Sequence, residues 1–372
     1  MATRRYSFGV IALAVLAGVP NAWAQGNSVG LSQDGRRLFT RETFGGNGRT
    51  CLTCHTFETG TVSPQDARRR YDENRYDPLF LHDGSDDGKG NGATRMLKNA
   101  TVLVEIPLPV NVSLADDPNA RSVVLRRGIP STLNTPALDP VLMIDGREPN
   151  LIEQAANAIR NHGQSTAVLS PVDLSRLTEF ELTKQFFSSE VLWKYARGGP
   201  APKLPQGRTE SEKRGKRFFD EIPPGPDLKN GLCTACHGGP MLNTTNHFLP
   251  PPIPGGARFQ SIGVSEFNAA GNPVREFIFH NSDGTTTRIK SPDPGRALIT
   301  GIANDPTGQN LNAFKIPTLW GVRRTAPYFH DNSAETLEQV AAHYARFFAA
   351  ISPIVLTPQD QADIVAYMKL LE

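Results

Sequence analysis

Cysteine is scarce in this sequence, with four among 372 residues, and an excess of charge of either sign is missing. The 39 basic and 37 acidic side chains leave a formal net charge of +2. Binding to nucleic acid or to an anionic membrane surface depends on many excess positive charges, so we expect neither partner. Beyond the N-terminal segment no apolar run has the length of a transmembrane helix. We therefore expect no membrane span in the mature chain.

The first 24 residues have the pattern of a secretory signal peptide. Arg4 and Arg5 give a positively charged start, residues 8–19 are mostly apolar, and Ala22 and Ala24 form a small-x-small cleavage site. This pattern predicts cleavage after Ala24 and a periplasmic mature protein. An uncleaved membrane anchor is the alternative.

The four cysteines fall into two identical Cys-x-x-Cys-His frames, residues 51–55 and 233–237. This is the attachment motif of c-type haem, because thiols one helical turn apart reach two vinyl groups while the histidine reaches the iron. A redox dithiol needs no following histidine, a zinc site would need ligands from both distant frames, and disulfides are the remaining alternative. We predict two covalently attached haem c groups, bonded to Cys51, Cys54, Cys233 and Cys236, with His55 and His237 as the proximal iron ligands.

The two frames lie in segments that resemble each other, which indicates an internal repeat. Residues 35–39 (GRRLF) precede the first frame, and residues 215–219 (GKRFF) precede the second. Farther on, Asp145 and Asp331 each lie six residues before a leucine that begins a helical pattern. A Pro- and Gly-rich linker covers residues 196–208. We predict a mainly α protein of two cytochrome c-like helical domains with long loops, at residues 25–204 and 205–372.

Local signals predict three of the helices. Thr336 with Gln339, and Thr209 with Glu212, have the spacing of capping boxes that open a helix. A third helix is expected over residues 150–161, where apolar residues recur at helical spacing. Strand-like alternation is confined to short stretches such as residues 101–106.

Several longer motifs resemble a known family from about Gly35 to the C-terminus. They are residues 130–134 (PSTLN), 145–147 (DGR), 236–240 (CHGGP), 314–319 (FKIPTL) and 325–331 (TAPYFHD). The chain is similar to the bacterial di-haem cytochrome c peroxidases, a family that includes the MauG-type enzymes. The resemblance implies that the N-terminal haem meets hydrogen peroxide and the C-terminal haem handles electrons. It also implies a small electron-donor cytochrome c or cupredoxin, or a protein substrate; it leaves homodimer formation open.

The resemblance places Tyr344 at the sixth position of the C-terminal iron. In the peroxidase branch a Met stands fourteen residues after the His that corresponds to His330, and here Tyr344 occupies that position, as in MauG-type ligation. Tyr344 also lies on the apolar stripe of its expected helix, whereas His343 points off it. That His343 is the ligand, or that neither residue is, remains open.

The N-terminal iron is expected to be open and five-coordinate. The repeat places Ala158 where the other half has Tyr344, and no histidine stands near residues 120–121, where the family's switchable ligand would fall. Gln154 matches the family's distal glutamine, but Gln164 replaces its acid–base glutamate. An amide does not shuttle a proton, so His162 is a candidate for that role. A structural histidine or a sixth ligand is the alternative for His162.

Two further family features are altered. The bridging tryptophan maps onto Ile144, so Trp320 is either a substitute or a core residue. An inter-haem calcium would take the carbonyls of Thr325 and Pro327, but its Asn ligand maps onto Gly128, which leaves calcium open. Residues 83–94 resemble the start of an EF-hand loop without its final glutamate, so an ordinary surface loop is expected.

Three functions are compatible with these residues. The first is peroxide reduction with electrons from a small periplasmic cytochrome. The second is a MauG-like oxidation of a partner protein or organic substrate, favoured by Tyr344 and by the missing glutamate and tryptophan. The third, a plain electron carrier, suits an open iron poorly. Peroxidase-type chemistry is the prediction that the breadth of the resemblance supports.

Overall fold

The computed structural model describes residues 24–222 and 225–372. The predicted signal peptide therefore lies outside the described residues, apart from Ala24 at its end. None of the described helices is long and apolar enough to cross a membrane.

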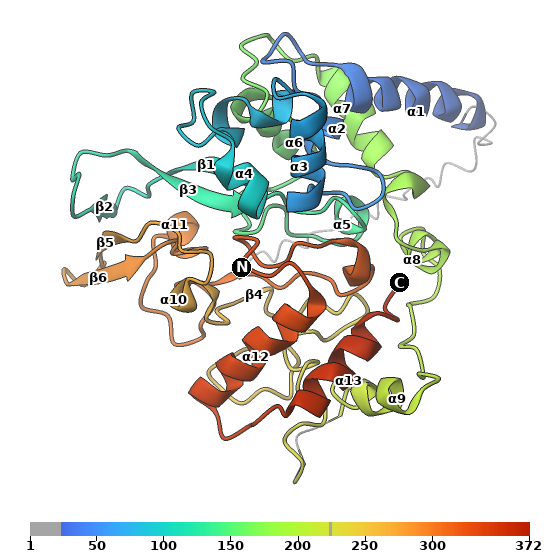
Figure 1. Ribbon diagram of the computed structural model, residues 1–372, viewed down its shortest axis with the longest axis vertical. Helices are drawn as coiled ribbons and strands as arrows, with labels where there is room; N and C mark the ends of the chain where they lie inside the picture. The colour runs from blue at the N-terminus through green and yellow to red at the C-terminus, as the bar shows by residue number, and fades with distance from the viewer. Residues whose placement is uncertain (1–23, 223–224) are drawn as a thin grey trace, which may run out of the picture.

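The first half of the chain forms the upper part of the molecule in Figure 1, and the second half forms the lower part. The upper helices are α1 (Ala24–Arg41), α2 (Cys51–Cys54), α3 (Pro64–Glu73), α4 (Thr94–Asn99), α5 (Thr135–Leu138), α6 (Leu151–Asn161), α7 (Pro171–Glu181) and α8 (Glu190–Tyr195). The lower helices are α9 (Glu210–Lys216), α10 (Val264–Phe267), α11 (Ala297–Thr300), α12 (Leu337–Ile351) and α13 (Pro358–Met368). Short 3-10 turns are η1 (Pro78–Phe80), η2 (His82–Gly84), η3 (Lys184–Phe186) and η4 (Val322–Arg324).

The helix-start signals in the sequence are confirmed. Thr209 and Thr336 each accept a hydrogen bond from the backbone N–H three residues on and complete a capping box. Asn150 caps α6 in the same position, through the N–H of Glu153. These caps satisfy backbone donors that the first turn of a helix leaves without partners, so local sequence alone sets where these helices begin.

The fold holds more sheet than the sequence indicates. The expected strand near residue 101 is β1 (Thr101–Pro107), and it pairs with β3 (Ser122–Gly128) in antiparallel register, Thr101 opposite Gly128. Two further small sheets order their strands as β2-β5-β6 and β4-β7. Their strands are β2 (Val112–Leu114), β4 (Phe259–Gln260), β5 (Arg275–His280), β6 (Thr286–Ser291) and β7 (Phe314–Lys315).

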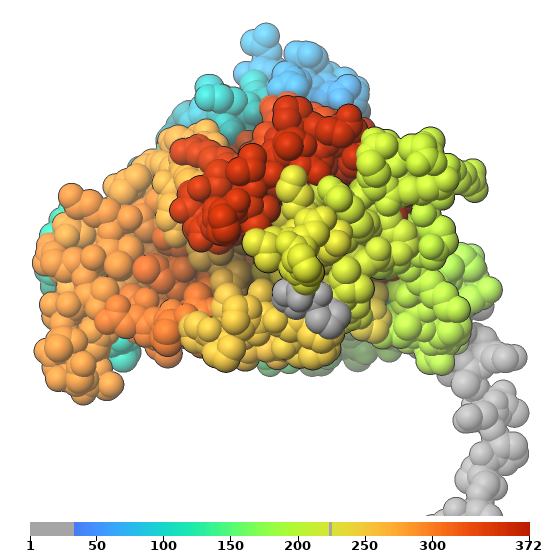
Figure 2. Space-filling view, turned by 90° about the horizontal axis from the view of Figure 1, so that it is seen from below, coloured from blue at the N-terminus to red at the C-terminus, as the bar shows by residue number. Residues whose placement is uncertain are grey.

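The β2-β5 pair joins the two halves of the chain, with Val112 opposite Phe279. Phe277, Phe279 and Leu298 are buried in the same apolar core as Leu79 and Ile106 of the first half. The segment around β5 and β6 forms one projecting edge of the face in Figure 2. The core of the first half thus extends across the predicted boundary near residue 204, and that boundary stays a prediction.

In each half, a glycine lets the first helix approach a later helix closely. A Cβ atom on Gly35 of α1 would lie 2.2 Å from the Arg176 carbonyl oxygen of α7, and 2.7 Å from the Phe180 Cβ. A Cβ atom on Gly215 of α9 would lie 2.0 Å from the carbonyl oxygen of Asp363 in α13, and Tyr367 follows at 2.8 Å. Such distances exclude any side chain, so each GxxxF segment is explained by a helix crossing.

Candidate functional site

The first frame is a single helical turn followed by a fixed imidazole. Thr50 caps this turn, its backbone N–H donating to the Thr53 hydroxyl at 2.9 Å. The Nδ1 atom of His55 lies 2.8 Å from the carbonyl oxygen of Gly60. A carbonyl only accepts, so Nδ1 carries the proton and donates, and Nε2 keeps its lone pair for a metal.

The second frame repeats this arrangement, although its turn is not a regular helix. His237 Nδ1 lies 2.8 Å from the carbonyl oxygen of Leu242, again five residues on. The backbone N–H groups of His55 and His237 each donate to the carbonyl of the first cysteine of their frame, both at 2.9 Å. Burial lowers the pKa of both imidazoles, which keeps them neutral and able to ligate iron.

The four cysteines are half-buried free thiols. Burial raises the pKa of Cys233 to about 12 and that of Cys236 to about 11, and it also raises the pKa of Cys51 and of Cys54. Such thiols are poor thiolates, which disfavours a reactive dithiol. Within residues 24–222 and 225–372, no cluster of three or more His, Cys, Asp or Glu side chains is arranged to hold a metal ion. Two paired thiols beside an imidazole whose Nδ1 atom is held by a backbone carbonyl fit a covalently bound haem in both frames.

The predicted distal residues lie at the end of α6, and the structure brings only some of them together. Gln154 is half-buried on this helix, one turn before Ala158. His162 caps the end of the helix, and its charge lowers the pKa of His55 after the larger effect of burial, so the two side chains lie within electrostatic reach of each other. Gln164 is exposed, with a left-handed backbone (φ 54°), and has no part in this arrangement.

Sequence reasoning missed the partner of His162. Its Nδ1 atom lies 2.6 Å from Oδ2 of Asp83, in the loop that was interpreted as an ordinary surface loop. Arg49 forms an ion pair with the other oxygen of the same carboxylate and also donates to the His162 carbonyl at 3.2 Å. Burial alone would raise the pKa of Asp83, but the hydrogen bond from His162 and the Arg49 charge outweigh it and lower the pKa. Asp83 is therefore a carboxylate at neutral pH and holds the His162 ring in one orientation.

The rest of that loop behaves as expected of a surface loop. The Asp87 carboxylate accepts hydrogen bonds from the backbone N–H groups of Lys89 and Asn91 and from the hydroxyl of Ser85. These bonds close the loop on itself. Asp83 differs from the rest of the loop because its partners, Arg49 and His162, lie 34 and 79 residues away in the sequence. The local sequence pattern therefore does not reveal its role.

Tyr344 and His343 point to different surroundings. Tyr344 packs against the second apolar core together with Cys233. Burial, and then the charges of the Cys236 and Cys233 thiols, raise the pKa of Tyr344, so its phenol lies within electrostatic reach of the second frame. His343 instead has its Nε2 atom 2.8 Å from the carbonyl oxygen of Ile262, so that nitrogen is already a hydrogen-bond donor.

Two other predicted features are Trp320 and the inter-haem calcium site. Trp320 is buried in the second core, and its indole N–H donates to the carbonyl of Pro240, three residues after His237. At Gly128, a Cβ atom would lie 2.1 Å from the Oδ1 atom of Asn332, so the second half fills the space left by the missing side chain. Thr325 is half-buried and Pro327 is buried, and calcium binding at their carbonyls stays a prediction.

The two halves also meet in a buried ion cluster. Arg127 donates to both oxygens of Asp293, at 2.7 and 2.9 Å, and also contacts Asp145. Arg147 donates to the same Asp145 at 2.9 Å. Beside this cluster His330 stacks on Phe314, with ring centroids 3.6 Å apart. Pairing of these charges offsets their cost of burial and fixes the halves against each other.

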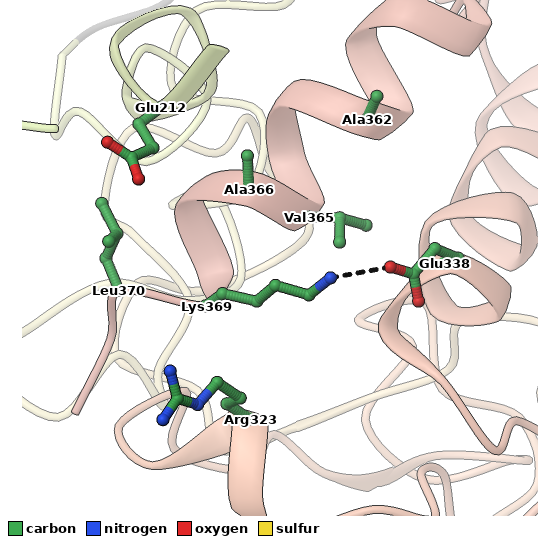
Figure 3. A pocket seen from close by; sticks show the side chains of 8 residues that line it. All are labelled: Glu212, Arg323, Glu338, Ala362, Val365, Ala366, Lys369 and Leu370. Atoms are coloured by element: carbon green, nitrogen blue, oxygen red, sulfur yellow. Dashed lines mark hydrogen bonds and ion pairs between the residues drawn. The ribbon is translucent and has the colours of Figure 1, made fainter. Parts of the chain in front are cut away.

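Two surface pockets involve the lower half, and the first of them is also lined by Leu138 and Tyr195 of the upper half. One, of about 420 Å³, is lined by Gly239, Pro240 and Met241, directly after the second frame. The other, of about 490 Å³, lies between α9, α12, α13 and η4 (Figure 3). There Lys369 donates to Glu338 at 2.9 Å, while Glu212 and Arg323 face the opening from separate elements. None of the predicted site residues lines this second pocket.

Comparison with known proteins agrees with this geometry. Cytochrome c551 peroxidase of Nitrosomonas europaea is 26% identical over 254 residues, which cover 65% of this chain and 64% of that protein. Cytochrome-c peroxidase IdrP1 of Denitromonas iodatirespirans is 28% identical over 154 residues, 37% of this chain and 36% of that protein. The matched segments thus span less than two thirds of these relatives. No family model matches the sequence.

Among solved structures, a MauG-like protein associated with microbial copper homeostasis has a similar fold. The TM-score is 0.51 at 20% sequence identity, and the alignment covers 95% of this chain and 91% of that chain. The chain is thus similar in sequence to cytochrome c peroxidases over part of its length, and similar in fold to a MauG-like protein.

Proposed function

We propose that the protein is a periplasmic di-haem c-type oxidoreductase that reduces hydrogen peroxide at its N-terminal haem with electrons passed through its C-terminal haem. The observation that carries this proposal is the difference between two otherwise matched frames. Tyr344 faces the second frame, whereas the first has Ala158 at the matching position and the oriented His162 nearby. One closed and one open iron suit electron transfer and peroxide binding respectively.

The protein's own residues would divide this work. Cys51, Cys54, Cys233 and Cys236 hold the two haems through thioether bonds, and the Nε2 atoms of His55 and His237 ligate the irons. The bound haems supply the redox chemistry. The carbonyls of Gly60 and Leu242 keep both imidazoles in the ligating tautomer. The proposal includes export with cleavage after Ala24 and two repeated haem domains divided near residue 204.

His162 would be the acid–base residue of the peroxide step. With Nδ1 hydrogen-bonded to Asp83, its Nε2 atom is free to take a proton from one peroxide oxygen and to return it to the departing one. Gln154 supplies an amide on the same helix that can hold the substrate by hydrogen bonding. Exposed Gln164 has no role in this proposal.

The test is a spectrum and a turnover assay on the exported protein. We expect two haems per chain, a high-spin ferric signal from the N-terminal iron, and rapid peroxide-dependent oxidation of a reduced small cytochrome c or cupredoxin. Two low-spin haems that are inert to peroxide would reduce the protein to an electron carrier and overturn the proposal.

A MauG-like oxidation of a partner protein or organic substrate is the second candidate, because of Tyr344. A phenolate ligand stabilises ferric iron and makes the C-terminal haem harder to reduce, which suits the storage of oxidising equivalents. Near-infrared charge-resonance absorption after peroxide addition, with slow turnover of small donors, would favour this candidate over the first.

A further inference from the structure

Glu181, the last residue of α7, is a buried carboxyl group without a charge partner. The residue is 7% exposed, and its Oε2 atom is fully buried without a hydrogen-bond partner in the structure. A buried carboxylate in this state is costly, because water no longer solvates the charge. The side chain is therefore favoured in its protonated, neutral form.

The surroundings of Glu181 are apolar and include the first frame. Its neighbour Phe180 packs edge-on against Phe39 and Phe186, with centroids 5.6 and 5.3 Å away. Cys51 packs on the same cluster, and its thiol pKa is raised by burial and then by the charge of Glu181. The carboxyl group thus acts electrostatically on a thiol to which the first haem would be bonded, and α7 packs in the same cluster as that thiol.

Charged side chains on the elements packed against α7 are engaged elsewhere or exposed. On α1, Asp34 pairs with Arg176, Arg37 pairs with Glu42, and Arg36 lies over the ring of Phe57. On α6, Glu153 contacts Asn150, and Arg160 is exposed. No charged group contributes to the titration of Glu181, and burial alone raises its pKa to about 8.

The second half shows that packing does not require a carboxyl group here. Phe180 and Tyr367 occupy matching positions at the two glycine crossings, so the residues that follow them, Glu181 and Met368, also correspond. Met368 is 5% exposed in the second core and carries no charge. The N-terminal half alone has a titratable group at this position.

We propose that Glu181 is the proton acceptor that couples electron arrival at the N-terminal haem to proton uptake. A one-electron donor converts ferric to ferrous iron, and the Glu181 carboxylate takes one proton from water, becoming neutral; oxidation reverses both changes. The positive charge of the ferric haem stabilises the carboxylate across a medium of low dielectric, and its loss on reduction removes that stabilisation. The inference rests on the proposed attachment of haem at Cys51 and Cys54.

The test is a redox titration of the full exported protein at several pH values between about pH 6 and pH 9, around the raised carboxyl range. In the unmodified protein the N-terminal haem potential should fall with pH, approaching about 59 mV per unit for one proton per electron. Glu181→Gln should flatten this slope. Glu179→Gln, an exposed glutamate on the same helix, is the matched control and should keep it.

A second readout is the redox-difference infrared spectrum. Reduction should produce the C=O band of a protonated carboxyl group, which Glu181→Gln removes and Glu179→Gln retains. An unchanged slope and band in Glu181→Gln would overturn the inference, as would a flat slope in the unmodified protein. Failure of the proposed function is separately visible, because it would appear as fewer than two haems per chain or as two low-spin haems that are inert to peroxide, whatever the pH dependence of the potential.

Discussion

The two halves of this protein build the same frame and surround it differently. Both fix an imidazole through a carbonyl five residues on, and both bring their first helix against a later one at a glycine. Around the first frame are a histidine held by an ionised aspartate and a buried glutamic acid. Around the second are a half-buried phenol and a methionine. The two frames thus share their backbone geometry, and a few side chains around them differ.

Removing each frame in turn should have the largest effect and should show most directly how the two halves differ in function. Cys51→Ala with Cys54→Ala is expected to leave one haem per chain and no reaction with peroxide. Cys233→Ala with Cys236→Ala should also leave one haem, but the remaining iron should still react with peroxide once, without sustained turnover. Haem content and stopped-flow absorbance measure both. Equal loss of the single reaction in the two variants would contradict the division of labour.

Removing the acid–base group should have the next largest effect. His162→Gln is expected to lower the rate of the peroxide reaction by about 10²–10⁴-fold, the usual contribution of general acid–base catalysis. Asp83→Asn should cost about 10–100-fold, the cost typical of removing a residue that orients a functional histidine.

Gln164→Ala, at an exposed position, is the matched control and should leave the rate unchanged. Conversion of the N-terminal iron from low to high spin in His162→Gln would instead make His162 a sixth ligand. The ferric absorption spectrum separates these outcomes.

Replacing the phenol of Tyr344 should show whether this residue or His343 is the sixth ligand of the C-terminal iron. Tyr344→Phe keeps the packing but removes the oxygen, so the C-terminal haem should change its ferric spectrum and become easier to reduce. His343→Gln should alter neither property, because its ring is turned to the Ile262 carbonyl. The opposite result, with the spectrum changed only in His343→Gln, would make histidine the ligand.

The smallest effects should come from the two helix crossings. Gly35→Ala and Gly215→Ala each place a methyl group within 2.2 Å of a backbone oxygen, and overpacking of this kind costs about 1–3 kcal/mol. We expect similar losses in the free energy of unfolding, measured by denaturant titration of each variant. A loss confined to one glycine would show that the two crossings are not equivalent.

Features encoded over a few neighbouring residues could be predicted from the sequence. The two Cys-x-x-Cys-His frames and the capping boxes at Thr209 and Thr336 belong to this group, because their partners lie within one turn of the chain. The apolar stripe likewise predicted that Tyr344 rather than His343 turns inward.

Features that depend on distant partners could not be predicted from the sequence. Asp83 contacts His162, which lies 79 residues further along the chain. The burial of the Glu181 carboxyl group results from the packing of α7, which no local pattern shows. The sequence pattern of Asp83 was that of a surface loop, which the neighbouring Asp87 indeed forms. The pairing of β2 with β5 was also missed, since such short strands carry little periodicity.

The pairing of β2 with β5 has a consequence for the order of biosynthesis. Residues 277–303 complete the core around Leu79 and Ile106, so the first half cannot finish folding until most of the chain has been made. Cys54 of the first frame packs against this core, so its surroundings are complete only when residues 277–303 have joined it. The order of the chain therefore makes this late segment the last part of the early core to be added.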